Sequence, residues 1–97
     1  MEYSETIKSA PVVLVEFYAS WCPHCQRMEP IVAQVRTQLK DRVPFYQYDI
    51  DKNEAESSEA GIQSVPTFII YRNGVEEWRH TGEIDGKDLL SKVEAYV

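Results

Sequence analysis

The run of β-branched and aromatic residues at Val12–Tyr18 constrains the fold most, because Glu16 is the only charged residue in it. An apolar run of this length is typical of a strand that is buried on both faces. Such a strand lies at the centre of a sheet, with helices above and below it. The chain is therefore expected to be an α/β protein, and Glu16 is an anomaly in its core.

The sequence after this strand predicts a helix that begins at a pair of cysteines. Cys22-Pro23-His24-Cys25 follows the strand closely, and the chain has no other cysteine. Pro23 suits the first position of a helix, because the N–H group there has no partner in any case. Apolar residues then recur at helical intervals, at Met28, Ile31, Val32, Val35 and Leu39.

The remaining segments predict alternating helices and strands. The expected elements are a short helix over Ser4–Ala10 with Ser4 as its cap, strands over Val43–Tyr48, Thr67–Tyr71 and Val75–His80, a helix over Asp51–Ala60 that ends at Gly61, and a last helix capped by Asp85. Asn73-Gly74 predicts a hairpin between the last two strands. Alternation gives a parallel pair of strands and the hairpin an antiparallel one, so we expect a three-layer α/β/α sandwich with a mixed sheet.

Composition limits the partners and the location. The 97 residues suffice for a single domain, 1–97, and carry a net charge of −6. Nucleic acids and anionic membranes are bound through basic patches, so this balance argues against both.

The longest apolar run, Val12–Val15, is far shorter than the ~20 residues of a membrane-spanning helix. The acidic start, Met1–Glu5, does not resemble a secretory signal. This favours the cytoplasm, or a periplasmic or secreted location if a signal peptide has been removed.

Two cysteines at this spacing, where a buried strand leads into a helix, indicate redox chemistry. The unpaired N–H groups at a helix N-terminus stabilise a thiolate, which makes Cys22 a nucleophile. Cys25 lies one turn further on, where it can resolve a mixed disulfide. The pair could instead be a structural disulfide, which would close only one helical turn, or half of a zinc site. Zinc would need two more ligands, and only His24 and His80 are available.

The chain resembles the thioredoxin family over nearly all of residues 5–97. Four matches occur in the right order: the active-site signature at Trp21–Cys25, a proline within the following helix at Pro30, a cis-proline loop at Gly61–Thr67, and a hairpin turn at Asn73-Gly74. The resemblance implies the thioredoxin fold. It also implies thiol–disulfide exchange between Cys22, Cys25 and protein disulfides, without a metal or an organic cofactor.

The resemblance also implies a substrate site beside Cys22. Pro66 matches the cis residue, and Val65 and Pro66 would form the surface that pairs with an extended substrate peptide. Gly82 matches a glycine near the substrate groove, and Pro23 lies at the reactive helix start. Trp21 is either a core residue or a partly exposed wall of this groove, and its position next to Cys22 favours the groove.

Three departures from the family pattern bear on function. The residues between the cysteines are Pro23-His24 instead of Gly-Pro, as in bacterial periplasmic thiol oxidases, which carry a helical insertion absent here. Glu16 matches a buried aspartate, and Gln47 matches that aspartate's lysine partner but carries no charge. The family's first strand has no counterpart. The sheet would then have about four strands, with Val43–Tyr48 at an edge.

Glu16 and His24 each have an ordinary and a functional interpretation. Glu16 either pairs with a surface lysine at the end of the sheet, or is a buried carboxyl with a raised pKa that accepts the proton of Cys25 through water. His24 is either a solvated residue or a group that tunes the Cys22 thiolate by charge or hydrogen bonding. The functional interpretation is favoured for both.

Three further features favour ordinary structural roles. These are His80 as a strand residue, Asp49–Glu59 as a solvated helix face, and Tyr46 and Tyr48 as part of a protected sheet edge, although that edge could also pair with a second chain.

The sequence thus predicts a small monomeric thiol–disulfide oxidoreductase that reduces protein disulfides. Cys22 would attack, Cys25 would resolve, Glu16 would handle the proton and His24 would set the potential. The resemblance implies a flavin-dependent thioredoxin reductase as the electron donor. Two alternatives remain: a disulfide oxidase or isomerase in an oxidising compartment, and a non-catalytic binding module that uses the groove around Trp21 and Pro66.

Overall fold

The computed structural model describes residues 1–97, and its elements follow the predicted order. They are α1 (Tyr3–Thr6), β1 (Val12–Tyr18), α2 (Pro23–Leu39), β2 (Phe45–Asp49), α3 (Glu54–Glu59), β3 (Thr67–Arg72), β4 (Val75–Thr81) and α4 (Gly86–Tyr96). Asp85 caps α4 as expected, since its carboxylate accepts from the Lys87 N–H at 2.8 Å.

Two predicted helices begin elsewhere. The first starts at Tyr3 with Glu2 as its N-cap, so Ser4 is not the cap. Tyr3 anchors this start, because its buried hydroxyl lies 2.8 Å from that of Tyr71. The helix predicted from Asp51 begins only at Glu54. Before it, Asp49 ends β2, and its side chain accepts from the Asp51 N–H at 2.9 Å in a turn. Asp49 is therefore not on the predicted helix face.

β2 begins two residues later than predicted, at Phe45. Pro44 has no N–H group to donate, although its carbonyl still accepts from the Leu14 N–H at 3.0 Å. Regular pairing therefore starts at the next residue, where Phe45 lies opposite Leu14.

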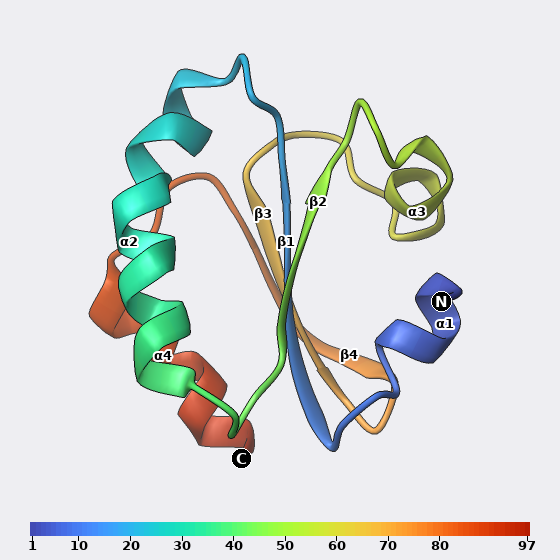
Figure 1. The fold of residues 1–97 in the computed structure, drawn as a ribbon, viewed down its shortest axis with the longest axis vertical. Coiled ribbons are helices and arrows are strands. Elements are labelled where there is room, and N and C mark those ends of the chain that lie inside the picture. The colour runs from blue at the N-terminus through green and yellow to red at the C-terminus, as the bar shows by residue number, and fades with distance from the viewer.

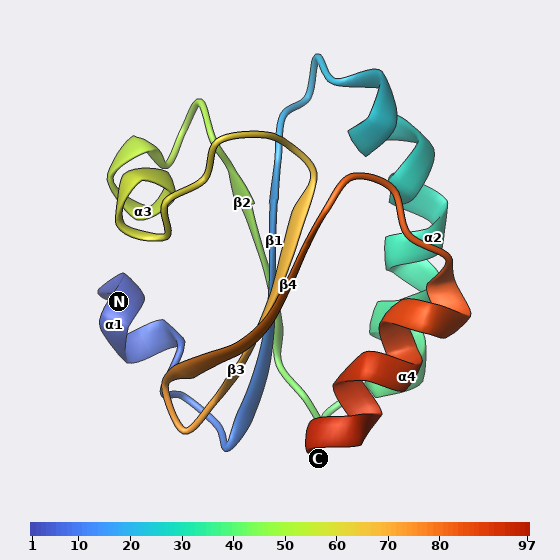
Figure 2. The ribbon, with the colours of Figure 1, turned by 180° about the vertical axis from the view of Figure 1, so that it is seen from behind.

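The sheet has four strands in the order β2-β1-β3-β4, with β2 at an edge, as predicted. β1 and β2 are parallel, and the other two pairs are antiparallel. Helices α2 and α4 cover one face of the sheet and α1 and α3 cover the other (Figure 1), and the reverse view shows the same three layers (Figure 2). The fold is thus the three-layer α/β/α sandwich that the sequence predicts.

β1 is buried on both faces, and its alternation determines where Glu16 points. Val13, Val15 and Phe17 pack in the cluster beside α1 and α3, whereas Val12 and Leu14 pack in the cluster beside α2 and α4. Successive side chains on a strand point to opposite faces, so Glu16 shares the face of Leu14. The carboxyl therefore lies beneath α2, the helix that begins at the cysteines.

The topology brings three loops to one end of the sheet. The register pairs Phe17 near the end of β1 with Thr67 at the start of β3, and Thr67 with Thr81 at the end of β4. The loop after β1, the loop before β3 and the loop after β4 therefore meet. A hydrogen bond of 2.8 Å from the Gly82 N–H to the Pro66 carbonyl joins the last two.

Candidate active site

Cys22 is the N-cap of α2, and Pro23 is its first residue. The Cys22 sulfur accepts from the Cys25 N–H at 3.4 Å, and both residues are free thiols that are almost fully buried. The free N–H groups and the dipole of α2 favour negative charge at this position. The helix that the sequence predicts at the cysteines is therefore present, with the first sulfur at its N-terminus.

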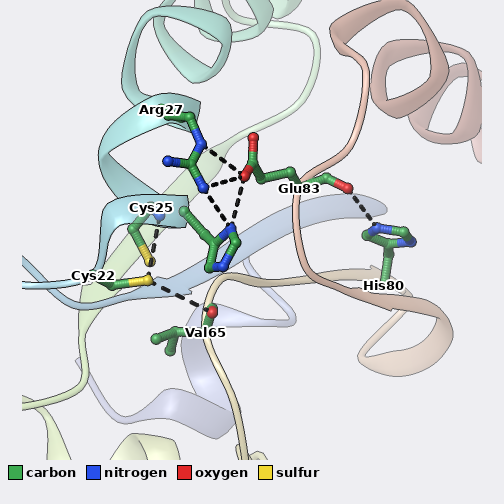
Figure 3. A network of polar contacts seen from close by, with 7 residues as sticks. Cys22, Cys25, Arg27, Val65, His80 and Glu83 are labelled. Atoms are coloured by element: carbon green, nitrogen blue, oxygen red, sulfur yellow. Dashed lines mark hydrogen bonds and ion pairs between the residues drawn. The ribbon is translucent and has the colours of Figure 1, made fainter.

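The cis-proline loop lies against Cys22. The Val65–Pro66 bond is cis, as predicted. The Cys22 thiol donates to the Val65 carbonyl over 3.8 Å, and Figure 3 shows this contact beside the one to the Cys25 N–H. Pro66 itself is buried, and the Val65 carbonyl is the group of this pair that contacts the sulfur.

Cys25 is in an environment that opposes ionisation. Burial raises the pKa of its thiol to about 12, and the neighbouring Cys22 and the Glu16 charge act in the same direction. A thiol with this pKa keeps its proton at neutral pH. Cys25 therefore needs a proton acceptor before it can act as a nucleophile.

Glu16 provides a buried carboxyl in the same region as Cys25. Burial raises its pKa to about 7, the Glu29 charge adds to this, and the Gln47 hydrogen bond and the Arg36 charge oppose it. Gln47 Nε2 donates to Glu16 Oε1 at 2.9 Å. The alternative in which Glu16 pairs with a surface lysine is therefore wrong, because the carboxyl is buried and its partner is an amide on the neighbouring strand.

Glu16 and Cys25 line the same cavity, which has a volume of about 170 Å³. Glu16, Tyr18, Cys25, Glu29 and Gln47 line it. A cavity of this size with several polar groups has room for water. The arrangement can therefore pass a proton from Cys25 to Glu16 through solvent.

The side chain of His24 is bonded to neighbours other than the sulfur. Its Nδ1 lies 2.7 Å from Glu83 Oε2 and 2.8 Å from Arg27 Nη2, while Arg27 Nε donates to the same Glu83 oxygen at 2.9 Å. Nδ1 can donate to Glu83 or accept from Arg27, but it cannot do both at once. The sequence analysis does not identify Glu83 or Arg27 as site residues. The only sequence feature that could have indicated Glu83 is its position directly after Gly82.

The carboxyl of Glu83 joins His24 and Arg27 at the active-site end of the sheet. The Arg27 hydrogen bond is the main cause that lowers the pKa of Glu83, and His24 adds to it. Figure 3 shows Arg27 on α2 and Glu83 after β4 turned toward each other, with His80 at the Glu83 carbonyl. His80 lies on β4 and stacks on Trp78, in keeping with its interpretation as a strand residue.

A groove of about 670 Å³ opens beside Cys22 on the side of α3. Trp21, 63% exposed, forms one wall, and its Nε1 donates to Asp51 Oδ2 at 2.9 Å. Pro23, Val65 and the α3 serines line other parts. Trp21 is thus a groove residue and not a core residue. Pro66 follows Val65 in the chain, and Gly82 donates to the Pro66 carbonyl, but neither residue lines the groove.

The comparison with known proteins decides the family. The family model described as thioredoxin matches residues 1–95. The chain belongs to the thioredoxin family. Members of this family reduce protein disulfides through their own cysteine pair and are generally reduced by thioredoxin reductase. The chain is therefore a thiol–disulfide oxidoreductase with Cys22 and Cys25 as its reactive pair.

Individual relatives match most of this chain. The chain is 33% identical to a thioredoxin of Rickettsia typhi, over 90% of this chain and 83% of that one. A thioredoxin-like protein of Synechocystis is 33% identical over 98% and 91%. A chloroplastic thioredoxin Y of rice is 36% identical over 91% of this chain, which spans only 52% of that relative.

Solved structures agree with the fold. A mutant thioredoxin from Halobacterium salinarum NRC-1 superposes with a TM-score of 0.85 at 30% identity, over 98% of this chain and 82% of that one. The oxidised thioredoxin of Plasmodium falciparum gives 0.82 at 28% identity, over 93% and 88%.

Two further findings concern metals and membranes. No three or more histidine, cysteine, aspartate or glutamate side chains gather where they could hold a metal ion. None of the helices has the length and apolar character needed to cross a membrane.

Proposed function

We propose that this thioredoxin-family chain is a single-domain, monomeric protein of the cytoplasm that reduces protein disulfides. Thioredoxin reductase would be its electron donor. The observation that supports this proposal best is the position of the Cys22 sulfur. It lies at the α2 N-terminus and against the Val65 carbonyl of the cis-proline loop. A substrate disulfide that reaches the groove would meet the sulfur there.

The first step consumes one substrate disulfide. The Cys22 thiolate attacks one substrate sulfur, a bond forms between the two, and the other substrate sulfur leaves as a thiolate that takes up a proton. Trp21, Pro23 and Val65 would hold the peptide along the groove, while Pro66 and Gly82 shape the loops beside it. The backbone N–H and carbonyl groups of Val65 are suited to pair with an extended peptide.

The second step releases the product. Cys25 passes its proton through water in the cavity to Glu16, and the resulting thiolate attacks the Cys22 sulfur. The Cys22–Cys25 disulfide forms, and the second substrate sulfur leaves and is protonated. The dithiol has then lost two electrons and the substrate has gained them, so a reductase must restore the pair.

The Pro23-His24 dipeptide favours a second candidate, an oxidase or isomerase. An imidazolium close to Cys22 would stabilise the thiolate and make the couple more oxidising. However, the Glu83 carboxylate, 2.7 Å from His24 Nδ1, offsets this charge. The contact supports the reductase over the oxidase.

Insulin reduction by the purified protein tests the proposal. With dithiothreitol as the electron source, the protein should speed the precipitation of insulin chains, and Cys22→Ser should abolish this effect. Cys25→Ser should instead trap a mixed disulfide with the substrate. Activity equal to that of Cys22→Ser would contradict the proposal and leave a binding role for the groove.

A further inference from the structure

Arg36, in the second half of α2, determines how the Gln47 amide lies. Its Nη2 donates to Gln47 Oε1 at 2.7 Å, its Nη1 donates to the Phe45 carbonyl at 2.8 Å, and its guanidinium lies 4.6 Å from the centre of the Phe45 ring. A guanidinium has only donors, so it can bond the oxygen of an amide but not its nitrogen. Arg36 is thus held against β2 and holds the oxygen of Gln47 toward itself.

The nitrogen of the amide then faces Glu16. Gln47 lies opposite Glu16 in the parallel pairing of β1 with β2, and its Nε2 donates to Glu16 Oε1 at 2.9 Å. Donors therefore point in one direction, from Arg36 through Gln47 to Glu16. The last acceptor is the carboxyl in the cavity that Cys25 also lines.

We propose that Arg36 is a positioning residue for the resolving step, because it fixes the Gln47 amide with its N–H group toward the Glu16 carboxyl. Arg36 touches neither the sulfurs nor the substrate groove and acts through Gln47. The predicted effect on rate rests on the proposed role of Glu16 as proton acceptor, whereas the effect on the carboxyl itself does not.

The groups around Glu16 give the direction of the effect. Glu29 and Cys25 face it from α2, Tyr18 from β1, and Arg36 is the cation whose charge favours the carboxylate. Without Arg36 the amide can turn its oxygen to Glu16 and accept the proton of a neutral carboxyl. The loss of the Arg36 charge and the rotation of the Gln47 amide both favour the protonated form of Glu16. A pKa rise of about one unit would lower the carboxylate fraction at pH 7 roughly fivefold.

The test is Arg36→Met, with two readouts. Carboxyl-carbon NMR follows the titration of Glu16, and rapid mixing of a preformed mixed disulfide follows the resolving step against pH. We expect both midpoints to move to higher pH by about one unit. Arg36→Lys, which keeps a cationic donor, should restore most of the wild-type behaviour. Arg42→Met removes the same charge next to Glu94 and should leave both midpoints unchanged.

Gln47→Met tests the same link if Arg36→Met does not fold, because it removes the amide and keeps Arg36. It should also raise the Glu16 midpoint. An unmoved Glu16 titration in the folded variant, or an equal shift in Arg42→Met, would overturn the inference. A shifted titration with an unmoved rate profile would show that Arg36 positions the groups around the carboxyl, but it would refute the role of Glu16 in the reaction and, with it, the effect of Arg36 on the resolving step.

Discussion

Glu16 on β1 and Cys25 on α2 line one cavity, and burial raises the pKa of both. The pKa of the thiol is about 12 and that of the carboxyl about 7. At neutral pH the thiol is therefore protonated, while about half of the carboxyl can accept a proton. In the proposed mechanism, this carboxyl is the base for the resolving step, in which a protonated thiol would be a poor nucleophile.

Glu16→Gln should slow the resolving step at pH 7 roughly 10²-fold, the lower end of what a positioned general base contributes. The amide keeps the shape and the hydrogen-bonding capacity but cannot take the proton. Rapid mixing of the mixed disulfide measures this rate. The matched control is Glu29→Gln in the same cavity, which should not slow the step, because Glu29 raises the pKa of Glu16. An unchanged rate in Glu16→Gln would remove Glu16 from the mechanism.

The same residue makes stability depend on pH. The folded-state pKa of Glu16, about 7, lies above its ordinary value of 4.5, so the folded protein holds a proton that the unfolded chain releases. Stability should therefore fall as pH rises from about 4.5 to about 7, by at most about 3 kcal/mol. Urea unfolding from pH 4 to pH 8 measures this loss. In Glu16→Gln the loss should shrink and the protein should be more stable at pH 8; an identical pH dependence would contradict the buried carboxyl.

The two thiols should differ in reactivity. Iodoacetamide at pH 7 should modify Cys22 in the reduced protein and leave Cys25 intact, because burial raises the pKa of Cys25 to about 12. Peptide mapping by mass spectrometry distinguishes the two sites. Equal labelling of both cysteines in the folded protein would refute this environment for Cys25.

The contact between His24 and Glu83 should set part of the redox potential. His24→Pro should make the couple more reducing by on the order of 30 mV, a tenfold change in the equilibrium with glutathione. Glu83→Gln should move the potential in the opposite direction, since it removes a negative charge that lies beside His24 and Arg27. Glu94→Gln removes a carboxylate that pairs with Arg42 instead, and should leave the potential unchanged. If neither His24→Pro nor Glu83→Gln shifts the potential, both residues are bystanders.

Much of this site follows from local sequence pattern, and the rest from side-chain contacts that pattern does not encode. The strand Val12–Tyr18 is evident from its run of apolar residues, which only Glu16 interrupts. The helix after Cys22 is evident because apolar residues recur there at helical intervals. The cis bond at Pro66 follows from the family resemblance. Arg36 does not stand out in the sequence, because its role depends on the packing of α2 across β2. The contact of Glu83 with His24 could not be predicted from the sequence either, because only the fold brings the loop after β4 close to His24.

The equilibrium reduction potential of the Cys22–Cys25 pair against a glutathione series tests the reductase account most directly. A value near −270 mV, about that of thioredoxin, is the result that a disulfide reductase with a compensated His24 predicts. A value between roughly −180 and −120 mV would contradict it, because such a pair donates disulfides and does not reduce them.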